Sequence, residues 1–138
     1  MKYVRFFLLA IFLIGTKAYS SNPNTAVTVN RLQASLRYGR AEELATMFNN
    51  EVDLIIDSED VDYSGITSSQ AQLILKAFFK HNPPVDFQTV FNKDNGTATR
   101  YHTGLLKTVK ETFNVSVVMK KTTDGEFKIA SIRFKIER

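Results

Sequence analysis

The chain has 138 residues, 14 of them acidic and 18 basic, and it contains no cysteine. Without a thiol it forms no disulfide, and it is not a lipid-anchored lipoprotein. Lys2, Arg5 and Lys17 lie in an expected leader over residues 1–20, so the rest of the chain carries 15 basic residues against 14 acidic ones. This balance argues against nucleic acid as a partner, because a nucleic-acid-binding protein needs a concentrated basic face.

The first 20 residues predict a secretory signal peptide. Two basic residues precede the apolar run Phe6–Ile14, and small residues lead to a cleavage site after Ser20. The alternative is a membrane anchor, but a spanning helix needs about 20 apolar residues and this run is well short of that. We therefore expect one mature domain over residues 21–138, secreted or periplasmic, with no membrane contact after the signal is removed.

Two helices and a strand are predicted next. Apolar residues recur at every third or fourth position from Ala26 onward, which indicates a helix. Gly39 ends it, because glycine adopts the left-handed conformation of a helix C′ position without a Cβ clash. A shorter helix follows over about Arg40–Phe48 and ends at the two asparagines after it, and the apolar run Val52–Ile56 predicts the first strand.

An acidic, turn-rich stretch then reaches Gly65, and a longer helix follows it. Thr67 and Gln70 match a capping box, in which each side chain satisfies a free backbone N–H group at the helix start. Apolar residues at helical spacing continue to about His81, whose side chain we expect to bond the last carbonyls of the helix. Two prolines directly afterwards prevent further turns.

Strands predominate in the rest of the chain. Asn95-Gly96, a strong hairpin signal, separates the strands Val85–Phe91 and Thr97–Val109. This order of elements, with helices and one strand before an antiparallel meander, indicates an α+β fold with helices on one face of the sheet.

Two long strands span Thr112–Ile136, and we expect a two-residue type I′ turn at Asp124-Gly125 between them. The apolar residues of the second strand change phase halfway along. One extra residue near Ala130-Ser131, a β-bulge, would return all of them to one face and bend the strand. These residues are Phe127, Ile129, Ile132, Phe134 and Ile136.

Several segments resemble one protein family. They are Gly39–Phe48, Val52–Leu54, Gln72–Phe79, His81–Pro84 and Thr103–Leu106. The resemblance is to an uncharacterised domain-of-unknown-function family of small exported bacterial proteins, found mainly in Bacteroidetes, and it extends from about Val29 to Ile136. It implies the nuclear-transport-factor-2-like, cystatin-like fold, a cone in which a strongly curved antiparallel sheet wraps a long helix and often leaves a cavity. Arg40 stands where the family tends to have an Asn or Asp cap, and His102 where a small residue is common.

His102 is the main candidate for a ligand-contacting residue. It shares a strand face with Gly104 and Leu106, and a glycine is expected where a helix approaches a sheet closely. We therefore expect His102 to point toward the helices, near Phe78 and Phe113. Desolvation would lower the pKa of the ring, and the neutral ring would offer one donor and one acceptor. With no second titratable group on this face, a histidine at a cavity rim is favoured over a general acid or base.

The opposite face of the sheet is a candidate for self-association. It carries Tyr101, Thr103, Leu105 and Val118, which together are polar enough for solvent and apolar enough for a partner. Domains with this superfold commonly pair through that face, so a homodimer is one expectation. The alternative is a monomer with scattered exposed apolar residues.

The segment Asp60–Gly65 copies the first half of an EF-hand calcium loop. The twelfth position of that loop would be a bidentate glutamate, but here it is Ala71, so we interpret the segment as a solvated acidic turn. The chain has two histidines without ligand spacing and no glycine-rich phosphate loop. We therefore expect neither a metal nor a cofactor.

Three functions stay open. We favour an exported, non-catalytic domain that binds a small apolar ligand or a protein partner through a cavity between sheet and helices. The first alternative is a small isomerase- or hydratase-like enzyme using His102, which would need a carboxylate or phenol within hydrogen-bond reach of the imidazole. The second is a structural dimerisation domain acting through the outer sheet face. The fold does not choose among them, because this scaffold hosts many unrelated functions.

Overall fold

A computed structural model describes residues 23–96 and 98–138, apart from the side chains of residues 23–26 and 95. The expected signal peptide lies outside the described residues. The helices are α2 (Pro23–Arg37), α3 (Ala41–Ala45) and α4 (Ser68–His81), and a short 3-10 helix, η3, spans Asp57–Glu59. The strands are β1 (Phe48–Ile56), β2 (Val61–Thr67), β3 (Pro84–Asn95), β4 (Thr99–Thr108), β5 (Thr112–Lys121) and β6 (Phe127–Ile136). Within this part of the chain, none of the helices has the length and apolar character needed to cross a bilayer.

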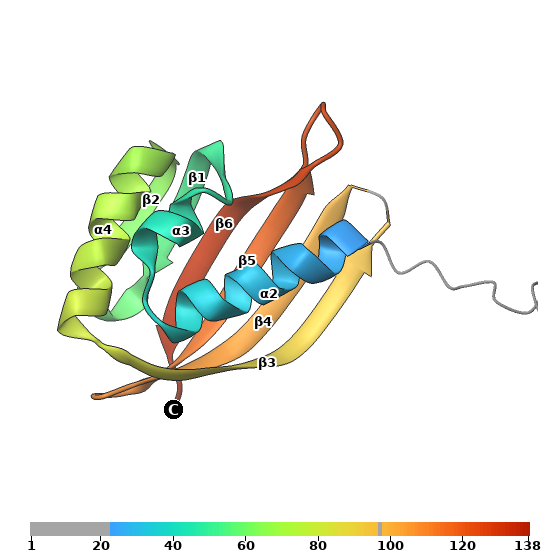
Figure 1. Cartoon of the computed structure of the whole chain (residues 1–138). Coiled ribbons are helices and arrows are strands. Elements are labelled where there is room, and N and C mark those ends of the chain that lie inside the picture. Colours follow the sequence, from blue (N-terminus) through green and yellow to red (C-terminus); the bar gives the residue numbers. More distant parts are fainter. Residues whose placement is uncertain (1–22, 97) are drawn as a thin grey trace, which may run out of the picture.

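The strands form one curved sheet in the order β2-β1-β6-β5-β4-β3, and the helices cover a single face of it (Figure 1). This confirms the predicted α+β fold. The sheet is not wholly antiparallel, however, because β1 pairs with β6 in parallel. The two strands are far apart along the chain, so no tight hairpin turn imposes an antiparallel direction on them.

The helix ends follow local sequence signals. The C-terminus of α2 is a Schellman motif, in which the N–H of Arg40 donates to the carbonyl of Ser35 at 2.8 Å and Gly39 takes the C′ position as predicted. The capping box of α4 is also confirmed: the N–H of Gln70 donates to Thr67 Oγ1 at 3.1 Å, and the N–H of Thr67 donates to Gln70 Oε1 at 3.0 Å.

The predicted second helix is too long. It ends at Ala45, and Phe48 and the two asparagines after it belong to β1. The N–H of Ile129 donates to the carbonyl of Met47 at 2.7 Å, so pairing with β6 draws the chain into the sheet just after the helix. The start of this helix also lacks a side-chain cap at Arg40, the position that departs from the family pattern.

Strand β2 replaces the turns predicted for the acidic stretch before α4. It is an edge strand, and most of its residues are exposed. Because neither of its faces is buried, its sequence lacks the alternation of apolar and polar residues that identifies a strand. Backbone pairing with β1 holds it in place.

The β5–β6 hairpin differs from the prediction at its turn and agrees with it in its strands. The turn spans Thr122–Gly125, where the N–H of Gly125 donates to the carbonyl of Thr122 at 3.0 Å. Gly125 has a positive φ of 89° and Asp124 does not, so the predicted type I′ turn is wrong. The bulge is confirmed: Met119 pairs with Ile129 and Val118 with Ser131, which leaves Ala130 as the extra residue.

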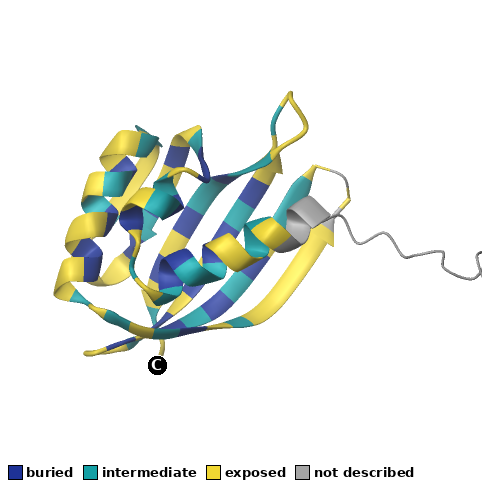
Figure 2. Cartoon of the chain, viewed as in Figure 1, coloured by how far each residue is buried: buried dark blue, intermediate teal, exposed yellow. Residues whose placement is uncertain are grey.

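The core lies between the sheet and the helix layer, and buried positions alternate along the central strands (Figure 2). Four phenylalanines, two on α4 and two on the strands beneath it, form an aromatic cluster, and each is at most 6% exposed. They are Phe78, Phe79, Phe113 and Phe134. Helix α2 covers the other end of the same face, where it contacts β3 (Figure 1).

Candidate functional site

A cavity of about 270 Å³ lies between α2 and the strands β3, β4 and β5. This volume is at the small end of the range of about 300–1,000 Å³ for ligand pockets. Its lining contains both apolar and polar side chains. Val29, Leu32 and Met119 contribute apolar side chains, and Asp94, Arg100 and His102 contribute polar ones.

A second β-bulge, in β3, determines which residues of that strand line this cavity. Thr89 pairs with Gly104 and Phe91 with Thr103, so Val90 is an extra residue. The bulge reverses the alternation of the remaining strand. As a result Asp94, which pairs with Arg100, shares the helix-facing side of the sheet with His102.

His102 belongs to a short chain of polar side chains. The residue is 3% exposed, and its Nε2 lies 3.2 Å from Thr89 Oγ1. Gln33 Nε2 on α2 donates to the same hydroxyl oxygen at 2.6 Å. The Thr89 hydroxyl is then free to donate its single hydrogen to His102 Nε2, which places the ring hydrogen of the neutral imidazole on Nδ1. We assign this tautomer from the hydrogen-bond pattern.

The Nδ1 atom of His102 is the unsatisfied end of this chain. It is buried and has no hydrogen-bond partner among the described residues. A buried donor without a partner is costly, so such an atom calls for an explanation. Burial also lowers the pKa of His102 from its ordinary value, because desolvation disfavours the charged ring.

Arg100 lies beside the cavity and is held on two sides. Its Nε is 3.1 Å from Asp94 Oδ1, and its guanidinium carbon is 3.7 Å from the centre of the Phe127 ring. The ring face attracts the cation and keeps the guanidinium group in place. Within the described residues, the two terminal nitrogens of Arg100 make no hydrogen bond or ion pair.

Gly104 makes room for an aromatic ring. A Cβ atom at this position would lie 2.6 Å from the carbonyl oxygen of Gln88 and would also overlap the ring of Phe87. The prediction that a helix approaches the sheet here is therefore wrong, because the close neighbour is a side chain of strand β3. The Phe87 ring lies nearly parallel to that of His102, with 6.2 Å between their centres.

The structure groups His102 with different residues than the sequence predicted. Phe78 and Phe113 belong to the closed aromatic cluster, with ring centres 5.2 Å apart, and Leu106 is fully buried. None of these three residues lines the cavity beside His102. The reason is the helix layer, because α4 covers the strands on the side of β1 whereas the His102 end of β4 lies beneath α2.

The residues predicted for self-association do share the outer face of the sheet. Tyr101 on β4 pairs with Val118 on β5. Along β4, Tyr101, Thr103 and Leu105 alternate with the buried residues of the inner face. The bulge in β3 adds two apolar residues that the sequence did not suggest. Val90 is 64% exposed and Phe91 is 49% exposed, and Phe91 pairs with Thr103.

The calcium-like motif does not form a loop. Asp60 ends η3, and the residues after it run as the extended strand β2. The N–H of Gly65 donates to Asp53 Oδ1 at 2.9 Å, so one nearby carboxylate serves the backbone of β2. In residues 23–96 and 98–138, no group of three or more His, Cys, Asp or Glu has an arrangement that could hold a metal ion.

The side chain that bonds the end of α4 is Asn82 and not His81 as predicted. The Asn82 side-chain amide donates to the carbonyl of Phe78 at 3.1 Å.

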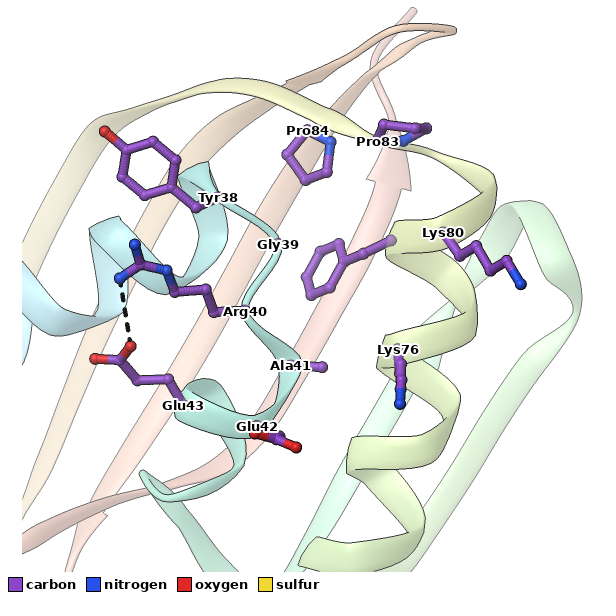
Figure 3. Close-up of a pocket in the computed structure, with 11 residues that line it drawn as sticks. Tyr38, Gly39, Arg40, Ala41, Glu42, Glu43, Lys76, Lys80, Pro83 and Pro84 are labelled. Carbon is purple, nitrogen blue, oxygen red and sulfur yellow. Dashed lines mark ion pairs between the residues drawn. The ribbon is translucent and has the colours of Figure 1, made fainter.

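A second hollow is wider and shallower. It has a volume of about 700 Å³ and lies between the α2–α3 corner, α4 and the start of β3 (Figure 3). Lys76 and Lys80 line the side of α4, and Glu42 lines the side of α3. Arg40 and Glu43 pair with each other at 3.6 Å and are exposed, so surface water screens them. The cavity beside His102 is smaller, but it holds a buried polar group without a partner.

Comparison with known proteins identifies the family. Residues 29–135 match the family described as Domain of unknown function (DUF4783). The chain belongs to this family. None of the curated proteins matches it.

Solved structures share the fold of this DUF4783 protein. A DUF4783 family protein from Bacteroides uniformis superposes with a TM-score of 0.72 at 20% identity, over 79% of this chain and 96% of that chain. A domain of unknown function with a cystatin-like fold from Nostoc punctiforme superposes with a TM-score of 0.67 at 11% identity, over 86% of this chain and 80% of that chain. An NTF-2-like protein of unknown function from Silicibacter pomeroyi superposes with a TM-score of 0.60 at 10% identity, over 83% of this chain and 93% of that chain. At these identities the similarity shows the fold alone.

The sequence did not indicate the polar residues around His102. A two-residue turn at Asn95-Gly96 would place Asp94 opposite position 97, whereas in the structure Asn95 pairs with Thr99 and Asp94 with Arg100. The ion pair between Asp94 and Arg100 therefore depends on a longer connection than the one predicted. Gln33 and Thr89 lie 56 positions apart, so no local pattern relates them.

Proposed function

We propose that this DUF4783 protein is a non-catalytic binding module that holds a small molecule in the cavity beside His102. The observation that carries the proposal is the buried His102 Nδ1, which lacks a partner within the described residues of an otherwise satisfied polar chain. Buried polar groups are nearly always hydrogen-bonded, and a ligand group is one means of satisfying this one. The apolar side chains of the same lining would contact the rest of the ligand.

The surroundings of His102 support binding over acid–base catalysis. An isomerase or hydratase would need a second proton-transferring group within about 2.6–3.2 Å of the reacting atoms. The group bonded to the ring is the neutral hydroxyl of Thr89. Asp94 lines the same cavity but is paired with Arg100. A lowered pKa also keeps the imidazole neutral near pH 7, as suits a fixed donor and acceptor.

A titration with hexan-1-ol, followed by methyl NMR of the folded domain, tests the proposal. We expect saturable shifts at Val29, Leu32 and Met119, whose methyl groups face the cavity. The methyl signal of Ala41, in the hollow of Figure 3, should stay in place. Shifts centred on Ala41, or no saturable shift at any of these groups, would contradict the proposal.

Two tryptophan variants of α2 provide the matched control. Val29→Trp should fill the cavity and abolish the shifts, because Val29 lines it. Val27→Trp places the same side chain on the same helix, at a residue that is 55% exposed and outside the cavity lining, so binding should persist. Equal binding by both variants would place the site elsewhere.

A second candidate function is self-association through the outer sheet face. The observation that favours it is the bulge in β3, which exposes Val90 and Phe91 next to the apolar residues of β4. Exposed apolar patches of this kind occur at protein interfaces. Sedimentation equilibrium should show a dimer for the native chain and a monomer for Phe91→Ser. A monomeric native chain at high concentration would exclude this function.

We also propose that the protein is exported, on the strength of the basic and apolar pattern of residues 1–20. Amino-terminal sequencing of protein from the periplasm or the medium should find a start at Ser21 or within a few residues of it. Recovery of chains that begin at Met1 from the membrane fraction would instead support the anchor.

A further inference from the structure

We infer that the ligands of the cavity beside His102 are small monocarboxylates with a short apolar body. The inference rests on the proposed binding function and adds the chemical class of the ligand to it. It is drawn from the donors that the cavity presents, the position of its one carboxylate and the volume of the cavity.

The first observation is the set of free donors on Arg100. A guanidinium group carries five N–H bonds in a planar fork that fits a carboxylate with two parallel hydrogen bonds. Asp94 lies against Nε, while the two terminal nitrogens make no bond among the described residues. The Phe127 ring holds the guanidinium plane in place, so little side-chain entropy would be lost when a ligand binds.

The second observation is the tautomer of His102. The hydrogen bonds from Gln33 to Thr89 and from Thr89 to Nε2 leave Nδ1 as a donor. This atom is shielded from solvent, and it belongs to a residue that lines the cavity. The free groups of both residues are therefore donors, and a ligand that offers acceptors fits them better than one that offers donors.

The charges around the cavity support an anion. Asp94 and Arg100 neutralise each other, the His102 ring is neutral near pH 7, and Lys93 also lines the cavity. The net charge of the lining is therefore positive. A ligand carboxylate would compete with Asp94 for the same guanidinium group, so Asp94 should weaken ligand binding. Removing the Asp94 charge should therefore raise the affinity, whereas removing the Arg100 charge should lower it.

The volume limits the rest of the ligand. About 270 Å³ is available, and a water molecule occupies about 30 Å³ of liquid. The apolar side chains of the lining, Val29, Leu32 and Met119, suit a short hydrocarbon chain. A six-carbon chain is therefore a suitable probe.

The experiment compares three probes that share this chain: hexanoate, hexan-1-ol and hexylammonium. Each is titrated into the folded native domain and followed by methyl NMR, with the ring nitrogens of His102 observed in the same samples. We expect hexanoate to bind about tenfold more tightly than hexan-1-ol, as charge-assisted hydrogen bonds allow, and hexylammonium most weakly. Hexanoate should also shift the Nδ1 signal of His102.

Three variants assign the effect to residues. Arg100→Gln should lower hexanoate affinity about tenfold and leave hexan-1-ol unchanged. Lys120→Gln removes one positive charge from an exposed residue of β5 outside the cavity lining, so it should change neither affinity more than about twofold. Asp94→Asn should raise hexanoate affinity severalfold, which keeps the test decisive if Arg100→Gln does not fold.

The outcomes separate this inference from the proposed function. Tight hexanoate binding that depends on Arg100 and improves in Asp94→Asn supports it. Equal affinity for hexanoate and hexan-1-ol overturns the carboxylate inference and leaves the binding function in place. A preference for hexylammonium overturns it as well and would identify Asp94 as the contact. Failure of all three probes to bind contradicts the proposed function itself.

Discussion

The half of the sheet beneath α4 and the half beneath α2 differ in how side chains pack between sheet and helix. Beneath α4, the rings of Phe78 and Phe134 lie 4.8 Å apart, and Phe113 packs edge-on against Phe78. Beneath α2, the same sheet carries His102, Thr89 and a cavity. One half is closed by large apolar side chains, and the other contains a cavity with polar side chains in its lining.

The hydrogen bonds show the same division. Within the described residues, four buried side-chain atoms lack a hydrogen-bond partner, and all of them belong to α2 or β4: Ser35 Oγ, Arg37 Nε, Arg100 Nε and His102 Nδ1. The two arginine nitrogens still lie close to carboxylates. Polar groups that a protein leaves unsatisfied in its interior cost stability. The comparison suggests that the half beneath α4 supplies the stability and that the half beneath α2 is free to bind.

The largest expected effect is in the closed half. Phe134→Ala should lower the free energy of unfolding by about 3–5 kcal/mol, because the ring is fully buried and packs on Phe78 and Phe79. Urea unfolding measures it. Leu73→Ala, at a residue of α4 that is 68% exposed, is the control and should stay within about 0.5 kcal/mol. A loss of less than about 1 kcal/mol at Phe134 would remove the distinction between the halves.

The next effect is at the boundary between the halves. Gly104→Ala should cost about 1–3 kcal/mol, because the added methyl group meets the Gln88 carbonyl and the Phe87 ring, and the backbone atom cannot move aside easily. Ser116→Ala, on the exposed side of β5, is the control. If Gly104→Ala is as stable as the native chain, the Phe87 ring can move aside, and the contact between Gly104 and Phe87 is not tightly packed.

The features that the sequence predicted are those with a local or periodic signal. The capping box of Thr67 and Gln70 involves four consecutive residues, and the phase change in β6 reports its bulge directly. The outer-face group around Tyr101 and Val118 follows from alternation alone. Such signals depend on neighbours along the chain, so no knowledge of tertiary contacts is needed.

The cavity could not be predicted because it depends on pairings between distant segments. The bulge at Val90 has no phase change to mark it, because Phe91 continues the spacing of Val85 and Phe87 and the residues after Phe91 are polar. Without that bulge Asp94 would face outward opposite Thr99, while Arg100 on β4 would still face the helices, so the ion pair would not form. The contact of Gln33 with Thr89 depends further on how α2 is placed on β3. These are tertiary facts, and the residues of the candidate site are mostly of this kind.

The smallest expected effect concerns the hollow half and is a dependence on pH. Burial lowers the pKa of His102 in the folded protein, and in the unfolded chain the ring returns to about 6.5. Between the two values the unfolded chain binds more protons, so stability falls as the pH falls. The contribution of the neutral ring is therefore complete above about pH 6.5 and is lost as the pH falls through the folded pKa.

Replacing the ring with a neutral amide tests this directly. The stability difference between the native chain and His102→Gln should shrink from about pH 7.5 to about pH 5 in urea unfolding, because only the native chain loses this contribution. The other charged groups, including Asp94 beside Arg100, are shared by both proteins, so their contributions cancel in the difference. His81→Gln, at the exposed end of α4, shows whether loss of any histidine has the same effect. A difference that stays constant or grows with acid would mean that the ring is as easily charged in the fold as in water, and that the half beneath α2 is open to solvent.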